Sequence, residues 1–404
     1  MSKKNLRRLK KENEVLKEKC ADKSNLISND TLTILLDMEM YLNRNYEFRY
    51  NTITQCTEYR KRGTIDYDTL DNRHLNSICM AVRKSGIECW DRDVSRFIFS
   101  TRVKEYHPLH SYMEKLPLWD GKDRVTDLAI CVSNDDYWVR SFHRWMLAVT
   151  AQWMGVSRTH ANSVAPVLIS TAQGLHKSTF LKELMPPELH AYYTDDFTLG
   201  SKGNAIRKLS EYGLVSIDEF DKESAGKMPL LKNLMQMTDL SFIKSHQKNF
   251  CKLPRIASFV ATTNRKDILT DPSGSRRFIC VEVKEKIQLA SINHTQLYAQ
   301  LRSEITSGER YWFDASEEAE IQLHNKPFYR TSVEEELFYS CFDIPKEGEE
   351  GIELTSSTIF AKVKKKFPGM MRKASAASFG RQLVAMGLKS IHTREGNKYV
   401  VKVV

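Results

Sequence analysis

The segment 170–179, with the sequence STAQGLHKST, has the residue types and spacing expected of a loop that binds phosphate groups. It lies between an apolar run and a helical pattern. In such a loop, backbone N–H groups at the start of a helix bind the phosphates, a lysine reaches the β and γ oxygens, and a hydroxyl holds Mg²⁺. Lys177 and Ser178 fit the last two roles. The nucleotide-binding residues predicted from this segment are Gln173, Gly174, Leu175, His176, Lys177, Ser178 and Thr179.

The loop departs from the full phosphate-binding pattern at two positions. The pattern requires glycine at positions 171 and 176, whereas this sequence has Thr171 and His176, which leaves Gly174 as the glycine inside the loop. A side chain at position 176 places a Cβ atom where the backbone approaches phosphate closely. Taken alone, the segment therefore also fits an ordinary strand–turn–helix connection.

Two acidic residues follow the next apolar run. Residues 214–217 read as a buried strand, and Asp218 and Glu219 come directly after it. In phosphoryl transfer from ATP, the first acid orients Mg²⁺ and its water shell, and the second polarises the attacking water. A strand that ends in a solvated acidic turn is the alternative, but the spacing from Lys177 favours catalysis. We therefore predict Ser178 and Asp218 as metal ligands and Glu219 as the general base.

Two further motifs follow in the same order. The run 256–261 ends in Thr-Thr-Asn, and Asn264 could bridge the attacking water and the γ-phosphate. The segment 274–278, GSRRF, delivers two guanidinium groups just before another strand. Arginine suits the charge on a transferring phosphoryl group, whether it comes from the same chain or from a neighbour. A polar strand cap and a surface arginine pair are the alternatives. The predicted catalytic residues are Glu219, Asn264, Arg276 and Arg277.

Basic and aromatic residues alternate in the segment 242–255, FIKSHQKNFCKLPR, which reads as a hairpin. Positive charge binds phosphates and aromatic rings stack on bases, so this segment could contact single-stranded nucleic acid. A solvated edge hairpin is the alternative. The residues predicted to contact DNA here are Lys244, His246 and Lys248.

The elements that position these motifs belong to a chain of several domains. Short apolar runs alternate with helical patterns after Ala165, which is typical of a three-layer α/β domain. Residues 25–155 read as mostly helical, and 334–342, 357–367 and 374–386 read as three helices before a basic hairpin. The predicted fold is an α-helical N-terminal region, an α/β three-layer P-loop NTPase core and a C-terminal winged-helix domain. The predicted parts are a basic helical tail 1–24, a helical domain 25–155, a P-loop ATPase domain 156–315 and a winged-helix domain 316–404.

Composition limits the class of protein and the kind of partner. The net charge of +10 favours an anionic partner such as nucleic acid, while 41% hydrophobic and 28% charged residues are typical of a soluble globular protein. The eight cysteines are scattered without the two-residue spacing of a zinc site, which favours free thiols in a reducing cytosol. No segment approaches the roughly 20 apolar residues that span a bilayer. We therefore expect a cytoplasmic protein without a membrane partner.

The C-terminal region offers a second nucleic-acid surface. Basic residues surround the candidate recognition helix 375–386, in which Arg381 lies. A winged helix of this kind could bind duplex DNA through backbone phosphates, with Arg381 as a contact. It could equally serve a protein contact, and the sequence leaves both open.

In this order, the motifs resemble the virulence-associated protein E family, which is similar to superfamily-three helicases and to the primase-helicases of phages and plasmids. The resemblance covers roughly residues 100–285 and includes His107-Pro108 and Trp119-Asp120-Gly121-Lys122. It implies a hexameric DNA helicase that uses ATP and Mg²⁺, translocates on single-stranded DNA and acts in replication of a phage or other mobile element. Each site would be completed by a neighbouring copy, and priming would need a separate primase.

Two other functions remain open from the sequence. The lost glycines also fit a DNA-binding replication or regulatory protein whose nucleotide site is silent, although the intact acids at 218 and 219 argue against it. An ATP-driven switch in phage defence needs the same site without unwinding. The motifs do not distinguish this switch from a helicase, since neither partner is encoded in them.

Overall fold

The computed structural model describes residues 31–404 apart from 157–158, 201, 223–225, 244–249, 270–271, 290, 332, 346–348, 350, 373, 389 and 394–395. The chain divides into two compact units, Met1–Lys115 and Leu116–Val404. The predicted basic tail 1–24 lies outside the described residues. Within the described part of the chain, no helix is long and apolar enough to cross a bilayer.

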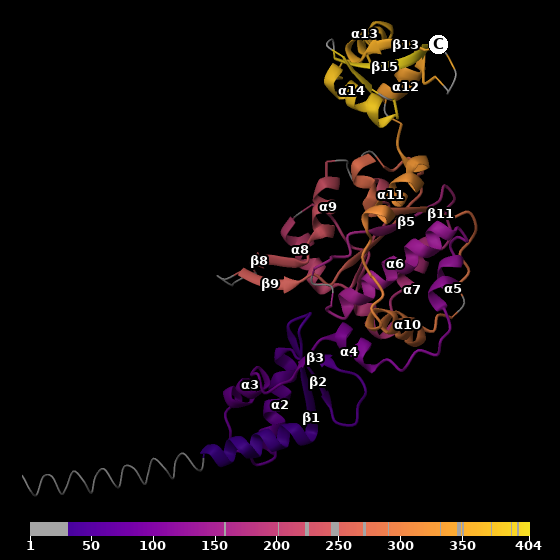
Figure 1. Cartoon of the computed structure of the whole chain (residues 1–404). Helices are drawn as coiled ribbons and strands as arrows, with labels where there is room; N and C mark the ends of the chain where they lie inside the picture. The colour runs from indigo at the N-terminus through magenta and orange to yellow at the C-terminus, as the bar shows by residue number, and fades with distance from the viewer. Residues whose placement is uncertain are drawn as a thin grey trace, which may run out of the picture. The chain divides into compact units, whose positions relative to one another are not determined.

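The first unit contains a four-stranded sheet in the order β3-β2-β1-β4 (Figure 1). On β1, Tyr46 and Phe48 join a hydrophobic core with residues of α2 and α3. At the alternate positions of the strand, Glu47 and Arg49 form ion pairs with residues of the antiparallel neighbour β2. The elements are a helix over 31–45, β1 Tyr46–Asn51, β2 Cys56–Lys61, β3 Asp68–Thr69, α2 Asn72–Lys84, α3 Asp91–Ile98, β4 Glu105–Tyr106 and α4 Pro108–Lys115.

This sheet corrects the prediction that residues 25–155 form a helical domain. The alternation of aromatic and charged residues along β1, YEFRY, has the period of two that a strand with one buried face requires. The predicted domain also crosses the boundary between the two units, which falls after Lys115.

The core of the second unit is a five-stranded parallel sheet in the order β11-β5-β10-β7-β6. The four apolar runs predicted as buried strands are confirmed. β5, β7 and β10 are buried along their whole length, which is the pattern of strands covered on both faces. The strands are β5 Ala165–Ile169, β6 Tyr193–Thr194, β7 Leu214–Ile217, β10 Ser258–Thr263 and β11 Phe278–Glu282.

Helix α6 belongs to this second unit and not to a separate helical domain. It packs on β5 and β11, and a side chain of its last turn is hydrogen-bonded to the segment just before β10. Gln152 Nε2 donates to the carbonyl oxygens of Arg255 at 3.1 Å and Ala257 at 2.8 Å. The helices here are α5 Arg124–Ile130, α6 Asp136–Trp153, α7 Lys177–Glu183, α8 Lys202–Glu211, α9 Met228–Gln236, α10 His294–Thr306 and α11 Ala315–His324.

The predicted boundary at residue 316 is also displaced. Phe328 lies in the same hydrophobic cluster as residues of β5, β7 and β10, and Tyr329 pairs with Leu269, so the α/β part extends to about residue 330. A separate cluster unites the elements that follow. They are α12 Val333–Tyr339, β12 Phe342–Asp343, β13 Ile352–Thr355, α13 Ser356–Lys366, α14 Ala376–Ala385, β14 Ser390–Thr393 and β15 Gly396–Val403. The three helices and the final hairpin predicted for this region are confirmed as elements.

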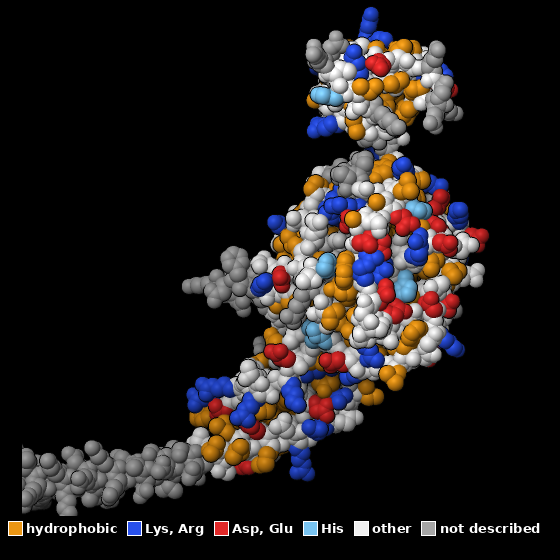
Figure 2. Space-filling model, viewed as in Figure 1, with side chains coloured by type: hydrophobic (Ala, Val, Ile, Leu, Met, Phe, Trp, Pro, Cys, Tyr) orange, Lys and Arg blue, Asp and Glu red, His pale blue; other side chains and the backbone are white. Residues whose placement is uncertain are grey.

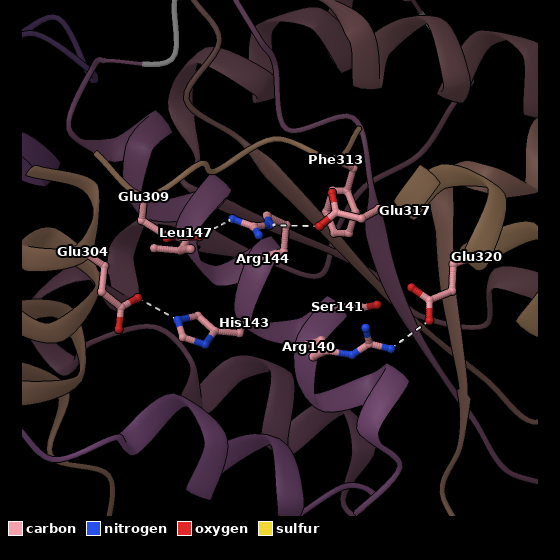
Figure 3. A pocket seen from close by; sticks show the side chains of 10 residues that line it. All are labelled: Arg140, Ser141, His143, Arg144, Leu147, Glu304, Glu309, Phe313, Glu317 and Glu320. Atoms are coloured by element: carbon pink, nitrogen blue, oxygen red, sulfur yellow. Dashed lines mark hydrogen bonds and ion pairs between the residues drawn. The ribbon is translucent and has the colours of Figure 1, made fainter. Parts of the chain in front are cut away.

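Ion pairs fasten α6 to α10 and α11 around a cavity of about 520 Å³ (Figure 3). Arg144 lies between Glu309, at 2.8 Å, and Glu317, at 3.3 Å. Arg140 pairs with Glu320 at 2.8 Å, and His143 Nε2 lies 2.6 Å from Glu304. The basic side chains of this wall of the cavity therefore already have acidic partners within the same unit.

The two arginines of this network differ in burial, and we therefore expect them to contribute differently to stability. The Arg144 side chain is 18% exposed and that of Arg140 is 67% exposed. We expect Arg144→Met to lower the free energy of unfolding by about 2 kcal/mol, because the partly buried Glu317 loses one of its two arginine partners and Glu309 loses its ion pair. The matched control Arg140→Met should change it by at most about 0.5 kcal/mol. Urea denaturation measures both, and equal effects would contradict this assignment.

Candidate functional site

The strand order brings three of the predicted motifs to one edge of the sheet. β10 lies between β5 and β7, with Ile169 beside Thr263 and Ile217 beside Ala261. The segments that follow these strands therefore leave the sheet side by side at its carboxyl edge. From β5 the chain crosses the sheet to β6, whereas from β10 it runs the opposite way to β11, so the connections diverge between β5 and β10. In open α/β sheets, ligands bind at the carboxyl ends of the strands at such a point.

Lys177, the first residue of α7, is held by oxygen acceptors from two neighbouring segments. Its Nζ donates to Asn264 Oδ1 at 2.9 Å and to the Ser170 carbonyl oxygen at 3.5 Å. The side chain is buried, and desolvation lowers the pKa of its amine. Both of these acceptors are neutral, so an anion that replaced them would bind the charged amine more strongly.

The predicted metal ligands also meet. Asp218 Oδ1 accepts hydrogen bonds from Ser178 Oγ at 3.2 Å and from Thr262 Oγ1 at 3.0 Å. No group of three or more His, Cys, Asp or Glu side chains that could hold a metal ion occurs among the described residues. One carboxylate and one hydroxyl fit Mg²⁺, since this ion usually keeps several waters and takes other ligands from substrate phosphates. Ser178 and Asp218 would hold it.

The loop before α7 turns through left-handed backbone at two positions. Gly174 has a φ of 76°, and His176, the N-cap of α7, has a φ of 61° and a ψ of 27°. Histidine adopts this region more readily than branched residues do, which explains how the chain keeps the turn without glycine at 176. The turn into α7 therefore forms with an exposed imidazole at position 176.

We expect His176→Gly to raise the free energy of unfolding by about 1 kcal/mol, because glycine removes the steric cost of the left-handed conformation. The reciprocal variant Gly174→Ala should lower it by a similar amount. Thermal unfolding measures both. If His176→Gly destabilises the protein instead, the imidazole makes a contribution beyond its backbone conformation.

Glu219 lies next to Asp218, but its carboxylate is engaged elsewhere. Its backbone has a φ of 54°, and its Oε2 lies 2.5 Å from Lys222 Nζ. Side chains held on a strained backbone of this kind cluster at functional sites. To polarise a water molecule, the carboxylate must exchange Lys222 for that water.

The two predicted arginines lie at the opposite edge of the sheet. They directly precede β11, whose first residue Phe278 pairs with Ala165 at the start of β5, whereas the loop before Lys177 follows the end of β5. Five residues of strand separate the two levels by about 16 Å. The structure therefore does not bring Arg276 and Arg277 to the Lys177 of their own chain.

The predicted DNA contacts are only partly described. Lys244, His246 and Lys248 lie outside the described residues, between β8 Asp239–Ile243 and β9 Phe250–Pro254, which form an antiparallel hairpin (Figure 1). Arg381 is exposed on α14. Over the face of the second unit shown in Figure 2, Lys and Arg side chains are interspersed with Asp and Glu and are not gathered in one patch.

The sequence interpretation missed several polar residues around this site. Thr262 Oγ1 donates a hydrogen bond to Asp218 Oδ1 at 3.0 Å, and Thr263 Oγ1 donates to Asp221 Oδ1 at 2.7 Å. The available signal was the pair of threonines just before Asn264, at the end of a strand that lies next to the one carrying the acids. Recognising it requires the strand order, which the sequence alone did not supply.

Two family models match the chain. Residues 113–330 match the virulence-associated protein E-like domain. Residues 331–401 match a domain of unknown function from B. Theta, DUF3874. Among curated proteins, none matches.

Solved structures similar to the chain include three apo structures of the NrS-1 C-terminal region. Their sequence identities to the chain are 11%, 12% and 13%, with TM-scores of 0.46, 0.45 and 0.47. The matches cover 92%, 91% and 92% of this chain and 99% of each of those chains.

Proposed function

Since the chain belongs to the virulence-associated protein E-like domain family through residues 113–330, we propose that it is an ATP-dependent nucleic-acid motor of helicase type that acts in replication of a phage or other mobile element. One observation carries this proposal. The amine of Lys177 and the carboxylate of Asp218 are presented together at the carboxyl edge of a parallel sheet, each already bonded to polar side chains of the adjoining segments.

In this proposal, the loop 170–176 and the N-terminus of α7 bind the phosphates of ATP. Lys177 exchanges Asn264 for the β and γ oxygens, which frees the Asn264 amide to contact the γ-phosphate or the attacking water. Mg²⁺, when bound, neutralises charge on the phosphates. Ser178 and Asp218 hold its coordination shell, and Thr262 keeps the Asp218 carboxylate oriented. Glu219 accepts the proton of the attacking water.

The arginine pair acts on the site of a neighbouring copy. Arg276 and Arg277 lie at the amino edge of the sheet, so they complete a nucleotide site only in an oligomer, for which we propose a hexamer. The β8–β9 hairpin would contact single-stranded DNA. The C-terminal part of the chain, from α12 to β15, would act as a winged helix that binds duplex DNA near Arg381.

ATP hydrolysis with and without single-stranded DNA tests this function. We expect DNA to stimulate turnover, and Lys177→Ala to lower it by at least about 10²-fold, because the transferred phosphoryl group loses its cation. The matched control is Lys182→Ala, which removes an exposed lysine from the same helix and should leave turnover unchanged. Tight ATP binding without turnover in the unmodified protein would contradict the motor and favour the silent-site alternative.

A further inference from the structure

The turn that carries the arginine pair is clamped by one buried amide from a distant part of the chain. Asn325, directly after α11, is completely buried. Its Nδ2 donates to the carbonyl oxygens of Ser275 at 2.9 Å and Phe278 at 2.8 Å, and its Oδ1 accepts from the backbone N–H of Cys280 at 3.4 Å. The hydrogen bonds described for this amide therefore hold the backbone on both sides of Arg276 and Arg277.

The residues that follow Asn325 hold the same region from its other end. The backbone N–H of Leu269 donates to the Phe328 carbonyl oxygen at 3.0 Å, and the backbone N–H of Arg330 donates to the Leu269 carbonyl oxygen at 2.8 Å. The hydroxyls of Ser275 and Tyr329 are hydrogen-bonded to each other. The segment 325–330 thus fixes the chain before the turn and after it.

Helix α11 also supplies a carboxylate to one of the two arginines. Glu318 Oε2 lies 3.2 Å from Arg276 Nη1, and the two side chains are 30% and 43% exposed. The start of α11 is rigid, because Asp314 and Glu317 form a capping box and Glu317 pairs with Arg144 and Arg310. Glu318, the partner of Arg276, therefore lies on a helix whose start is held by several contacts, and the ion pair remains accessible to solvent.

We propose that α11 is the positioning element of the arginine pair, with Asn325 fixing the backbone of the turn and Glu318 orienting the Arg276 guanidinium towards the nucleotide of a neighbouring copy. This rests on the proposed function, in which these arginines act between copies. Electrostatic stabilisation of a phosphoryl transition state depends on groups placed in advance, and a displacement of 1 Å can cost on the order of 10²-fold in rate. Glu318 and Asn325 act through the arginines and touch no substrate.

Mixed oligomers of the full-length chain test this role. A donor copy carries Lys177→Ala, which disables its own site but keeps its arginines. An acceptor copy carries Arg276→Ala with Arg277→Ala, which keeps its own site but offers no arginine. Each copy alone should be inactive, and the mixture should hydrolyse ATP. Glu318→Ala added to the donor should lower kcat of the mixture roughly ten-fold at unchanged KM.

The same substitution placed on the acceptor is the decisive control. We expect no change there, because the acceptor has no arginine for Glu318 to orient, whereas a merely structural role would lower activity on either copy. Glu318→Gln on the donor should restore part of the rate, since it keeps an acceptor for Arg276. Glu320→Ala, on the same helix but paired with Arg140, should have no effect on either copy.

Asn325→Ala tests the hydrogen bonds from the Asn325 amide to the backbone around the arginine pair. On the donor it should lower kcat on the order of 10²-fold, and on the acceptor it should leave activity intact. Equal losses on donor and acceptor for both Glu318→Ala and Asn325→Ala would overturn the positioning role. Failure of the starting mixture to hydrolyse ATP, although the unmodified protein does so, would instead overturn the action of the arginines between copies.

Discussion

Glu219→Gln should lower ATP turnover by roughly 10²- to 10⁴-fold while the affinity for ATP remains within a few-fold of that of the unmodified protein. Glutamine keeps the size of the side chain and its hydrogen-bonding capacity, but it cannot accept the proton of the attacking water. Lys177, Ser178 and Asp218, which would hold the nucleotide and its metal ion, are unchanged in this variant. Steady-state hydrolysis gives the rate, and titration calorimetry with ATP gives the affinity.

Lys222 supplies a complementary variant for the same carboxylate. Because Lys222 Nζ lies 2.5 Å from Glu219 Oε2, Lys222→Ala should free the carboxylate and leave turnover equal to or above that of the unmodified protein. Glu211→Gln, which alters a partly exposed i,i+4 pair with Arg207 on α8, is the neutral control. Loss of ATP binding in Glu219→Gln would contradict the assignment, because it would show that the residue maintains the strained backbone and not the chemistry.

Arg255→Met should lower the free energy of unfolding by about 3–5 kcal/mol. The Arg255 side chain is 3% exposed, and burial lowers its pKa to about 9, which still leaves it charged at neutral pH. Its donors reach the carbonyl oxygens of Asn162 at 2.8 Å, Ala257 at 2.9 Å and Met237 at 3.3 Å, and also that of Met235. Methionine keeps the apolar stem but removes the guanidinium donors from the carbonyls of Asn162, Met235 and Met237, while the Ala257 carbonyl keeps Gln152 as a donor.

Lys252→Met is the matched control for Arg255→Met. Lys252 lies on β9 close to Arg255, but its side chain is 70% exposed and its ion pair with Asp239 spans 3.4 Å. Its replacement should change the free energy of unfolding by at most about 0.5 kcal/mol. Chemical denaturation followed by circular dichroism compares the two variants. A loss below about 1 kcal/mol for Arg255→Met would mean that water replaces the guanidinium as the donor.

Continuous apolar runs made the strands of the α/β core predictable from sequence. β5, β7 and β10 are each buried from end to end, so their residues had to be apolar or small, and few other elements of this length have that composition. The polar residues that follow these strands were predicted to lie together, and hydrogen bonds join Lys177 to Asn264 and Ser178 to Asp218. Their roles in catalysis remain predictions.

What the sequence did not predict depends on contacts between distant segments. Arg255 was counted among the basic residues of a hairpin, but its side chain is buried against carbonyl groups of its own segment and of two others. Helix α11 was assigned to the C-terminal domain, because its own sequence does not indicate that it packs on the turn with Arg276 and Arg277. In the sheet of the first unit, β3 and β4 have two residues each, too few to establish a period, whereas the alternation along β1 was present in the sequence and was missed.

Lys177 and the arginine pair lie at opposite edges of one sheet, and this separation affects how ATP turnover depends on protein concentration. In a head-to-tail assembly, a copy receives an arginine through one edge and offers its own through the other. An open chain of copies always leaves one terminal nucleotide site without arginines, and only closure completes the last. If the arginines act between copies, ATP turnover per copy therefore rises with protein concentration and becomes independent of it once rings are closed.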